Sequence, residues 1–291
     1  MTIITSTTND IIGPEHYGES EILPLRSLEY IAIIKISIQL IPSTARTINF
    51  KNLTRKYMRI LAIGDIHGCS RAFDTLMEAV KLQPGDRLIT LGDYVDRGPD
   101  SKGVIDRLIG LDHTGQLVAL RGNHEIMMID AHCYPHRLEG WLASGGRETL
   151  ASYAASPKKR GKLDDIPDEH LSFITNICRD WWETEDHFFV HANVNPHQPL
   201  SQQSGHDLFW TRFYHAQPHC SGKTMICGHT SQKSGRPISL GYAICIDTWV
   251  YGKGWLTCLD VNSGQIWQAN QKGQRRTAWI EDFSTYCAIS S

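Results

Sequence analysis

The sequence predicts an α/β protein whose polar turns gather at one edge of a sheet. Between residues 59 and 125, three apolar runs of strand length alternate with two segments of helical periodicity. Each run ends in a glycine-flanked polar turn, and the turns recur after strand–helix–strand units of about 30 residues, the length that a parallel crossover needs. We therefore expect the turns at one edge of the sheet, where α/β proteins form their sites.

The first unit is a strand that follows Arg59 and ends in the turn of residues 64–68. Ser70 is expected to cap the next helix, and Pro84 and Gly85 to end it. The buried face of this helix is predicted from the helical spacing of Phe73, Leu76, Met77 and Val80.

The second unit begins with a strand at residues 87–91 and a polar turn at residues 92–98. A helix follows, with one apolar face made of Val104, Ile105, Leu108 and Ile109. A third strand at residues 117–120 runs into the polar segment 121–125.

The rest of the chain is expected to be helical up to residue 183 and then rich in strands. One helix starts within residues 145–150, and residues 158–162 form a basic surface loop. Another helix is predicted from the buried face Leu171, Ile174, Cys178 and Trp181. Strands are expected at residues 187–190, 223–227, 243–246, 255–259 and 265–268, with a hairpin turn at residues 262–264.

The composition is that of an ordinary globular protein, 41% hydrophobic and 21% charged over 291 residues. A formal net charge of -2 gives no electrostatic reason to expect nucleic acid or an anionic membrane as a partner. The eight cysteines are scattered without a Cys-x-x-Cys pair, and no basic residue precedes an apolar run at the N-terminus. We expect a cytoplasmic protein with free thiols and no signal peptide.

Residues 1–57 lack the periodicity of the following chain and are expected to be a disordered or dispensable extension. Their apolar run, residues 30–41, contains Lys35 and is shorter than the roughly 20 residues that a membrane helix needs. The predicted catalytic domain comprises residues 58–291 and begins at Met58.

The polar turns carry ligand-competent side chains that could share one site. Any one of them is better explained as a structural turn or a hydrogen-bonded histidine, but the set occurs in order after five strands. Mixed oxygen and imidazole donors suit manganese, iron or zinc, and the set is too large for one metal with an open position. The set suffices for two metals that share Asp93. Its members are Asp65, His67, Asp93, Asn123, His191 and His229.

Three of these turns resemble the signature blocks of the PPP family of metallophosphatases, within the calcineurin-like metallophosphoesterases. They are Gly-Asp-Ile-His-Gly (64–68), Gly-Asp-Tyr-Val-Asp-Arg-Gly (92–98) and Gly-Asn-His-Glu (122–125), and His191 and His229 match its later histidine blocks. The chain is most similar to the small bacterial and phage-type serine/threonine protein phosphatases, from Met58 to about residue 270. The resemblance implies an αββα sandwich, two mixed β-sheets flanked by helices, with a small helical cap.

The resemblance also assigns roles to site residues. Asp65, His67 and Asp93 would hold one metal, and Asp93, Asn123, His191 and His229 the other, with manganese expected and iron or zinc as alternatives. Phosphate would be bound by Arg97, Arg212 and Asn123, and a forked guanidinium suits phosphate oxygens. His124 would be the general acid, oriented by Asp96, and a metal-bridging hydroxide would attack without a covalent intermediate.

One position departs from the family pattern. After residues 246–248 similar proteins usually have glycine, whereas this chain has Trp249, followed by Tyr251. A harmless loop change is favoured slightly over a bulkier wall beside the substrate.

The expected activity is dephosphorylation of phosphoserine and phosphothreonine in proteins, with phosphotyrosine as a further substrate. The alternative is a symmetrical dinucleoside tetraphosphatase, such as a diadenosine tetraphosphate hydrolase, but those enzymes usually lack the carboxylate found here at Asp96. A third hypothesis is a catalytically inactive scaffold that binds phosphoproteins. The expected partners are phosphorylated proteins, without nucleic acid, membrane or an obligate partner.

We expect a chain that comprises residues 58–291 to remain soluble and active, because the predicted domain begins at Met58. Far-ultraviolet circular dichroism and phosphatase turnover, compared with the full chain, would check this expectation. An insoluble or inactive product would contradict it.

Overall fold

The computed structural model describes residues 58–156, 159 and 161–283. The expected extension, residues 1–57, lies outside the described residues, so its dispensability stays a prediction. Two members of the expected basic loop, Lys158 and Arg160, also lie outside them.

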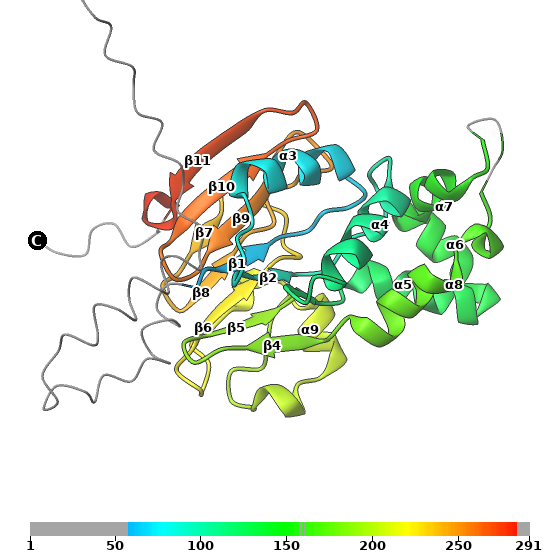
Figure 1. The fold of residues 1–291 in the computed structure, drawn as a ribbon. Coiled ribbons are helices and arrows are strands. Elements are labelled where there is room, and N and C mark those ends of the chain that lie inside the picture. The colour runs from blue at the N-terminus through cyan, green and yellow to red at the C-terminus, as the bar shows by residue number, and fades with distance from the viewer. Residues whose placement is uncertain (1–57, 157–158, 160, 284–291) are drawn as a thin grey trace, which may run out of the picture. The chain divides into compact units, whose positions relative to one another are not determined.

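Two β-sheets form the centre of the described chain (Figure 1). The first has the order β11-β10-β9-β1-β2-β3 and consists of β1 (Ile60–Ile63), β2 (Arg87–Thr90), β3 (Leu117–Ala119), β9 (Leu256–Asp260), β10 (Gln265–Ala269) and β11 (Arg275–Trp279). The second has the order β4-β5-β6-β8-β7 and consists of β4 (Trp181–Glu183), β5 (His187–Val190), β6 (Thr224–Cys227), β7 (Ile238–Ser239) and β8 (Ala243–Cys245). Strands β1, β2 and β3 are parallel to one another, as are β5, β6 and β8. Each sheet therefore carries several strand ends at one edge.

Alternating side chains of each strand supply two different apolar layers. In β1, Leu61 and Ile63 belong to the cluster on the outer face of the first sheet, whereas Ala62 belongs to the cluster shared with the second sheet. In β5, Phe189 lies in that shared cluster and Phe188 in the cluster on the outer face of the second sheet. The two sheets are thus packed face to face.

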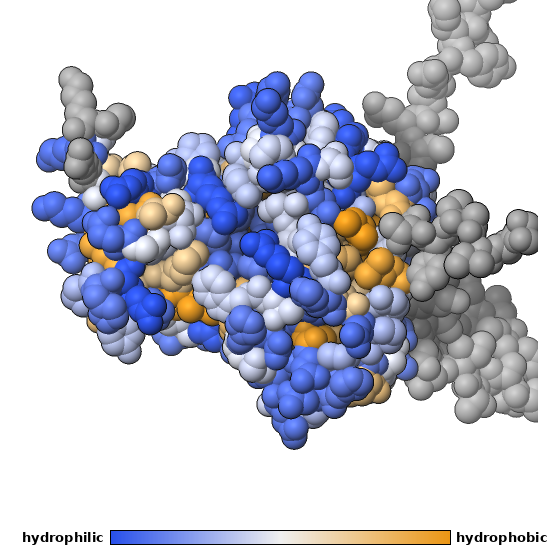
Figure 2. Space-filling model, turned by 180° about the vertical axis from the view of Figure 1, so that it is seen from behind, coloured by the Kyte–Doolittle hydropathy of each residue, from blue (hydrophilic) through white to orange (hydrophobic). Residues whose placement is uncertain are grey.

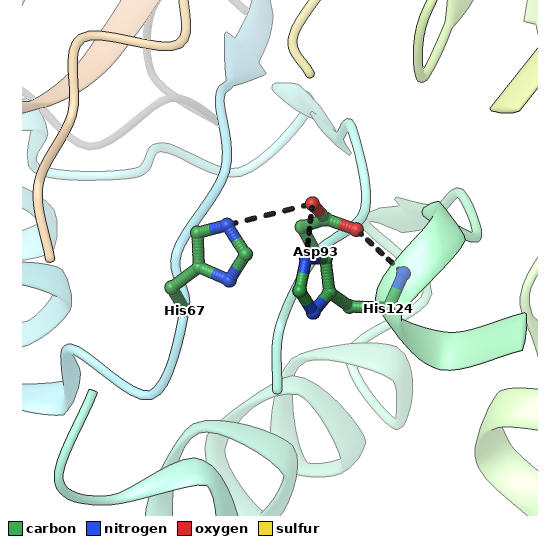
Figure 3. A group of neighbouring side chains, drawn as sticks. All are labelled: His67, Asp93 and His124. Carbon is green, nitrogen blue, oxygen red and sulfur yellow. Dashed lines mark hydrogen bonds and ion pairs between the residues drawn. The ribbon is translucent and has the colours of Figure 1, made fainter. Parts of the chain in front are cut away.

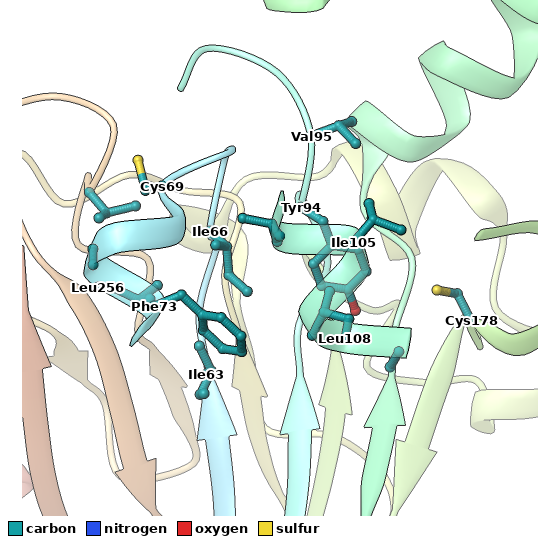
Figure 4. Packing of buried hydrophobic residues seen from close by; sticks show 14 of the residues in the cluster. Ile63, Ile66, Cys69, Phe73, Tyr94, Val95, Ile105, Leu108, Cys178 and Leu256 are labelled. Atoms are coloured by element: carbon teal, nitrogen blue, oxygen red, sulfur yellow. The ribbon is translucent and has the colours of Figure 1, made fainter. Parts of the chain in front are cut away.

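Helices cover the outer faces of both sheets. Helix α3 (Ser70–Val80) packs on β9 and β10, α4 (Ser101–Asp112) contacts β3, and α9 (Gly205–Trp210) joins the apolar cluster of the second sheet. Phe73 of α3 lies against Ile63 and Ile66 in the core (Figure 4). Four more helices form a helical lobe (residues 123–178) at one end of the sheets (Figure 1): α5 (Asn123–Cys133), α6 (Leu138–Trp141), α7 (Arg147–Tyr153) and α8 (Asp168–Ser172). The structure confirms the αββα sandwich with a small helical cap.

Several local expectations were wrong. Ser70 is the first residue of α3 and makes no side-chain cap. The helix ends at Val80 and is followed by Lys81 with a φ of 49°, so it does not reach Pro84. The helix expected through Trp181 stops earlier, because α8 continues only as a π-helical turn (Phe173–Ile177) and Trp181 instead pairs with Val190 in the sheet. Pairing with a neighbouring strand thus overrides the helical spacing there. Strands β7 and β11 were not expected either.

None of the described helices is long and apolar enough to cross a membrane. The seven cysteines of the described residues are free thiols. The face turned away in Figure 1 is mostly hydrophilic, with small apolar patches between the polar side chains (Figure 2).

We expect Phe73→Ala to lower the free energy of unfolding by about 3–5 kcal/mol, because Phe73 is 1% exposed and its removal leaves a cavity. Chemical denaturation would measure the change. Glu78→Ala, at an exposed position of the same helix, is the matched control and should stay within about 0.5 kcal/mol. Equal effects of the two substitutions would contradict the assignment of this core.

Candidate metal centre

The structure brings the predicted turn residues to the same edge of the two sheets. Asp65 and His67 follow β1, Asp93 follows β2, and the N-terminus of α5 provides the residues after β3. His191 and His229 follow β5 and β6 in the second sheet and meet the first set there. The site therefore lies where the ends of parallel strands from both sheets converge.

Three of the expected ligands have left-handed backbone conformations. The φ values are 45° at His67, 51° at Asp93 and 58° at His229. Such conformations cost free energy for residues other than glycine and persist only where the surrounding structure holds them. The turns are therefore shaped for the placement of these side chains and not for local backbone stability.

Two glycines allow the backbone to approach the carboxylates closely. A Cβ atom on Gly228 would lie 2.0 Å from Asp65 Oδ1, and one on Gly122 would lie 2.1 Å from Asp93 Oδ1. Any larger residue would displace these carboxylates.

Hydrogen bonds fix which nitrogen of two histidines carries the proton. His67 Nδ1 lies 2.9 Å from the carbonyl oxygen of Val95, and His191 Nδ1 lies 2.8 Å from that of Leu91. Because a carbonyl only accepts, Nδ1 donates in both rings and Nε2 carries the lone pair. Those Nε2 atoms face Asp93, at 3.4 Å from Oδ2 and 3.5 Å from Oδ1 respectively.

The side-chain oxygen of Asn123 lies close to nitrogen atoms of two histidines. Its Oδ1 atom is 3.0 Å from His191 Nε2 and 2.9 Å from His229 Nδ1. His229 Nε2 lies 3.2 Å from the carbonyl oxygen of Trp210 and so donates, which leaves Nδ1 as an acceptor. With the amide oxygen turned toward the two rings, three acceptors converge, and a cation bound between them would use all three as ligands.

The charges of the site agree with such a cation. Burial lowers the pKa of His229 to about 3, so this imidazole is neutral and can act as a ligand. Burial alone would raise the pKa of Asp93, but the surrounding His191, His124 and His67 hold it well below its usual range. Burial, together with the nearby Asp247 and Asp93, raises the pKa of Asp65, and a divalent cation would relieve this crowding of carboxylates.

Among the described residues, two groups of side chains have ligand atoms within 4.8 Å of one another, and both contain Asp93. One consists of His67, Asp93 and His124 (Figure 3), and the other of Asp93, His191 and His229. Asp65 belongs to neither group; its oxygens accept the backbone N–H of His229 at 3.1 and 3.2 Å. The residues fit a pair of metals on the two sides of Asp93, and the role of each single ligand stays a prediction.

Sequence reasoning missed the role of Glu125, which holds the central turn. Its buried carboxylate accepts the backbone N–H groups of Asp93, Tyr94 and Gly122 at 2.7, 2.7 and 2.8 Å. Burial raises its pKa to about 7, and Asp93 adds to the shift. Its position three residues after the helix-capping Gly122, where a capping glutamate is common, was the available signal.

Asp247 was also missed as a site residue. It is buried after β8, lies near Asp65, and accepts hydrogen bonds from Ser231 Oγ at 2.6 Å and from the backbone N–H of Trp249 at 3.0 Å. Like the predicted ligands, it is a carboxylate directly after an apolar strand, which is the signal that could have identified it.

His124 and Asp96 form a buried pair beside this centre. His124 Nδ1 is 2.7 Å from Asp96 Oδ2, and burial of His124 is outweighed by the charges of Asp93 and Asp96, which raise its pKa. Asp96 also accepts from Trp141 Nε1 at 2.9 Å and from Thr149 Oγ1 at 2.7 Å, both from the helical lobe. The Asp96 carboxylate thus has fixed donors, and His124 Nε2 faces the centre, 3.9 Å from Asp93 Oδ2.

A cavity of about 570 Å³ opens onto these groups and is lined by both predicted phosphate-binding arginines. Arg97 Nη1 donates to His67 Nε2 at 2.9 Å, and its guanidinium lies 4.7 Å from the centre of the Tyr251 ring. Arg212 Nη1 donates to the carbonyl oxygen of His229 at 3.3 Å. Cationic side chains therefore stand at the mouth of the centre, where an anionic substrate would enter.

Comparison with known proteins relates the chain to two named activities. It is 28% identical to serine/threonine-protein phosphatase 1 of Salmonella typhimurium over 54% of this chain and 70% of that protein. It is 40% identical to the symmetrical bis(5'-nucleosyl)-tetraphosphatase of an Acidovorax species, over 48% of this chain and 45% of that protein. The chain thus spans less than half the length of that tetraphosphatase.

Solved structures share the fold at low identity. A chain assigned as a diadenosine tetraphosphatase aligns with a TM-score of 0.53 and 18% identity, covering 76% of this chain and 93% of that one. A serine/threonine phosphatase from Saccharomyces cerevisiae aligns with a TM-score of 0.50 and 17% identity, covering 72% and 75% of the two chains.

The family model for the calcineurin-like phosphoesterases matches residues 58–233. This range contains the ends of β1, β2, β5 and β6 and all six predicted metal ligands. Phosphoesterases of this family use a binuclear divalent metal centre, which agrees with the two groups of side chains around Asp93. The chain therefore belongs to the calcineurin-like phosphoesterase family.

Proposed function

We propose that this phosphoesterase is a metal-dependent protein phosphatase that hydrolyses phosphoserine and phosphothreonine, with phosphotyrosine as a further substrate. The observation that carries the proposal is the buried His124–Asp96 pair, with its 2.7 Å hydrogen bond. A serine alkoxide is a poor leaving group and needs a proton from a positioned acid. An imidazole held by a carboxylate through Nδ1, with Nε2 turned toward the centre, would provide that acid.

The metals would be held by Asp65, His67 and Asp93 on one side and by Asp93, Asn123, His191 and His229 on the other. We propose manganese, because the donors mix oxygen and imidazole, with iron or zinc as alternatives. When bound, such a pair polarises the phosphoryl group and acidifies water.

The chain's own residues perform the remaining tasks. Arg97 and Arg212 bind the phosphate oxygens from the mouth of the cavity, where both line the wall. Asp96 holds His124 Nδ1, so the Nε2–H group of the protonated ring is directed at the leaving oxygen. Trp141 and Thr149 hold Asp96 in turn and limit its rotation.

The second candidate function is hydrolysis of dinucleoside tetraphosphates. Relatives with that name reach 40% identity, and Trp210, Tyr214 and Tyr251 give the cavity an aromatic wall on which a base could stack. A nucleotide leaves readily without a proton, so this reaction would not require the His124–Asp96 pair. We therefore favour the phosphatase. The cytoplasmic location expected from the sequence stays a prediction.

We expect the purified chain, assayed with manganese, to hydrolyse a phosphoserine peptide with a higher kcat/KM than diadenosine tetraphosphate. Release of inorganic phosphate from the peptide and chromatography of the nucleotides would measure the two rates. Much faster cleavage of the dinucleotide would reverse the choice, and absence of turnover with both would favour the inactive scaffold.

We expect His124→Asn and Asp96→Asn to reduce kcat on a phosphoserine peptide by about 10²–10⁴-fold, because the leaving alkoxide loses its acid. The loss on p-nitrophenyl phosphate, whose phenolate leaves readily, should be much smaller. Steady-state kinetics on both substrates would measure the difference.

His132→Asn, at an exposed position of the same helix, is the matched control and should leave both rates unchanged. The double variant should lose no more than His124→Asn alone, since the two groups act as a unit. Equal losses on the two substrates would contradict the acid role.

A further inference from the structure

Trp249 has a backbone conformation that is unusual for a bulky residue. Its φ is 65°, in the left-handed region that glycine adopts without cost. The conformation is held from both sides: its N–H donates to Asp247 Oδ1, and its carbonyl oxygen accepts from the N–H groups of Gly252 and Gly254, each at 3.1 Å. A strained residue that its surroundings hold so firmly is a reason to ask what its side chain does.

The indole of Trp249 lies between the loop backbone and two residues of the cavity wall. A Cβ atom on Gly252 would lie 2.3 Å from its Cε2 atom, so the ring rests directly on that glycine. Lys233 Nζ lies 6.0 Å from the centre of an indole ring, and the Tyr251 ring is 6.3 Å away at 85°. Both neighbours line the cavity that contains Arg97, Arg212 and His124. Trp249 thus packs against two residues of the cavity wall from the side of the loop.

Lys233 is a third cation in the wall, and no acidic side chain of the described residues pairs with it. It is exposed, and among the described residues no hydrogen bond or ion pair joins it to another side chain. Of the described residues that line the cavity, Asp93 alone is acidic, and it belongs to the metal centre. At about 570 Å³ the cavity is much larger than one phosphate group, so a second anionic group of the substrate can reach Lys233.

We propose that Lys233 is a specificity-determining residue that pairs with a carboxylate near the phosphorylated residue of the substrate, and that Trp249 is its positioning residue. The face of an indole attracts an ammonium group and restricts where it lies. The inference rests on the proposed function and names its substrate class: phosphoproteins with acidic residues beside the phosphorylated serine or threonine.

Two phosphoserine peptides that differ only in three flanking residues, glutamate or glutamine, would test the proposal. We expect the full chain to favour the acidic peptide about fivefold in kcat/KM, the size of an exposed ion pair, and to lose this preference at high salt. Lys233→Ala should bring the ratio of the two kcat/KM values close to one, and Lys233→Glu should invert it. Because each variant supplies both values, a general loss of activity cancels. Lys253→Ala, an exposed lysine outside the cavity lining, is the matched control and should keep the ratio.

Trp249 requires two variants, because a loop change could also disturb folding. Trp249→Phe keeps an aromatic face and should retain the ratio, whereas Trp249→Gly fits the backbone but removes the face and should lose it. The change should fall on KM, since positioning of Lys233 affects binding of the flank and not the departing oxygen. A ratio that Trp249→Gly leaves intact would overturn the role of Trp249.

The outcomes separate this inference from the proposed function. If both peptides are hydrolysed but the ratio is near one or is unaffected by Lys233→Ala, the inference is wrong and the phosphatase stands. If neither peptide is hydrolysed and Lys233→Ala impairs only diadenosine tetraphosphate cleavage, both are wrong, and the cation serves a polyphosphate chain.

Discussion

The buried negative charge of Asp93 is the constraint on which the rest of this site depends. An ionised carboxylate that is 2% exposed is stable only with cations or donors around it. The chain supplies His67, His191 and the backbone N–H of His124 around the carboxylate, and Glu125 holds the turn that carries it. The imidazoles of His67 and His191 turn their lone pairs toward the carboxylate, as the ligands of a cation do. A divalent cation beside Asp93 would accept these lone pairs and compensate the buried charge.

That support comes from the packing of two sheets whose parallel strands end at the same edge. The shared apolar layer, with Ala62, Ile89 and Phe189 among its members, fixes the strand ends relative to one another. Left-handed conformations at His67 and His229 are unfavourable locally, and the buried layers beneath them offset that cost. The turns at this edge are thus held in place by the apolar residues buried between and beneath the sheets.

The sequence predicted the α/β class, the order of the first three strands and the turn residues, because that information is local. Each predicted ligand follows an apolar run that identifies its strand. The partners of Asp96 could not be predicted, since Trp141 and Thr149 are 45 and 53 residues away and reach it only through the packing of the lobe. The same applies to Trp181, whose helical spacing was overridden by pairing with Val190, and to Glu125, whose carboxylate accepts backbone N–H groups of another turn. Local sequence pattern identifies the residues that follow a strand, whereas tertiary contacts determine which residues hold them in place.

The two walls of the cavity depend on different parts of the chain. One wall contains His124 and Asp96 and is fixed by the helical lobe through Trp141 and Thr149, so a change in lobe packing would move the proposed acid. The opposite wall, Tyr251 and Lys233, is supported by Trp249 within a loop that glycines allow to close tightly. Arg97 connects the two walls, because it directly follows Asp96 in the chain and its guanidinium lies over the Tyr251 ring. Under the proposed roles, substitutions in the loop would alter which substrate flank is accepted while His124 stays in place, because the two walls have separate supports.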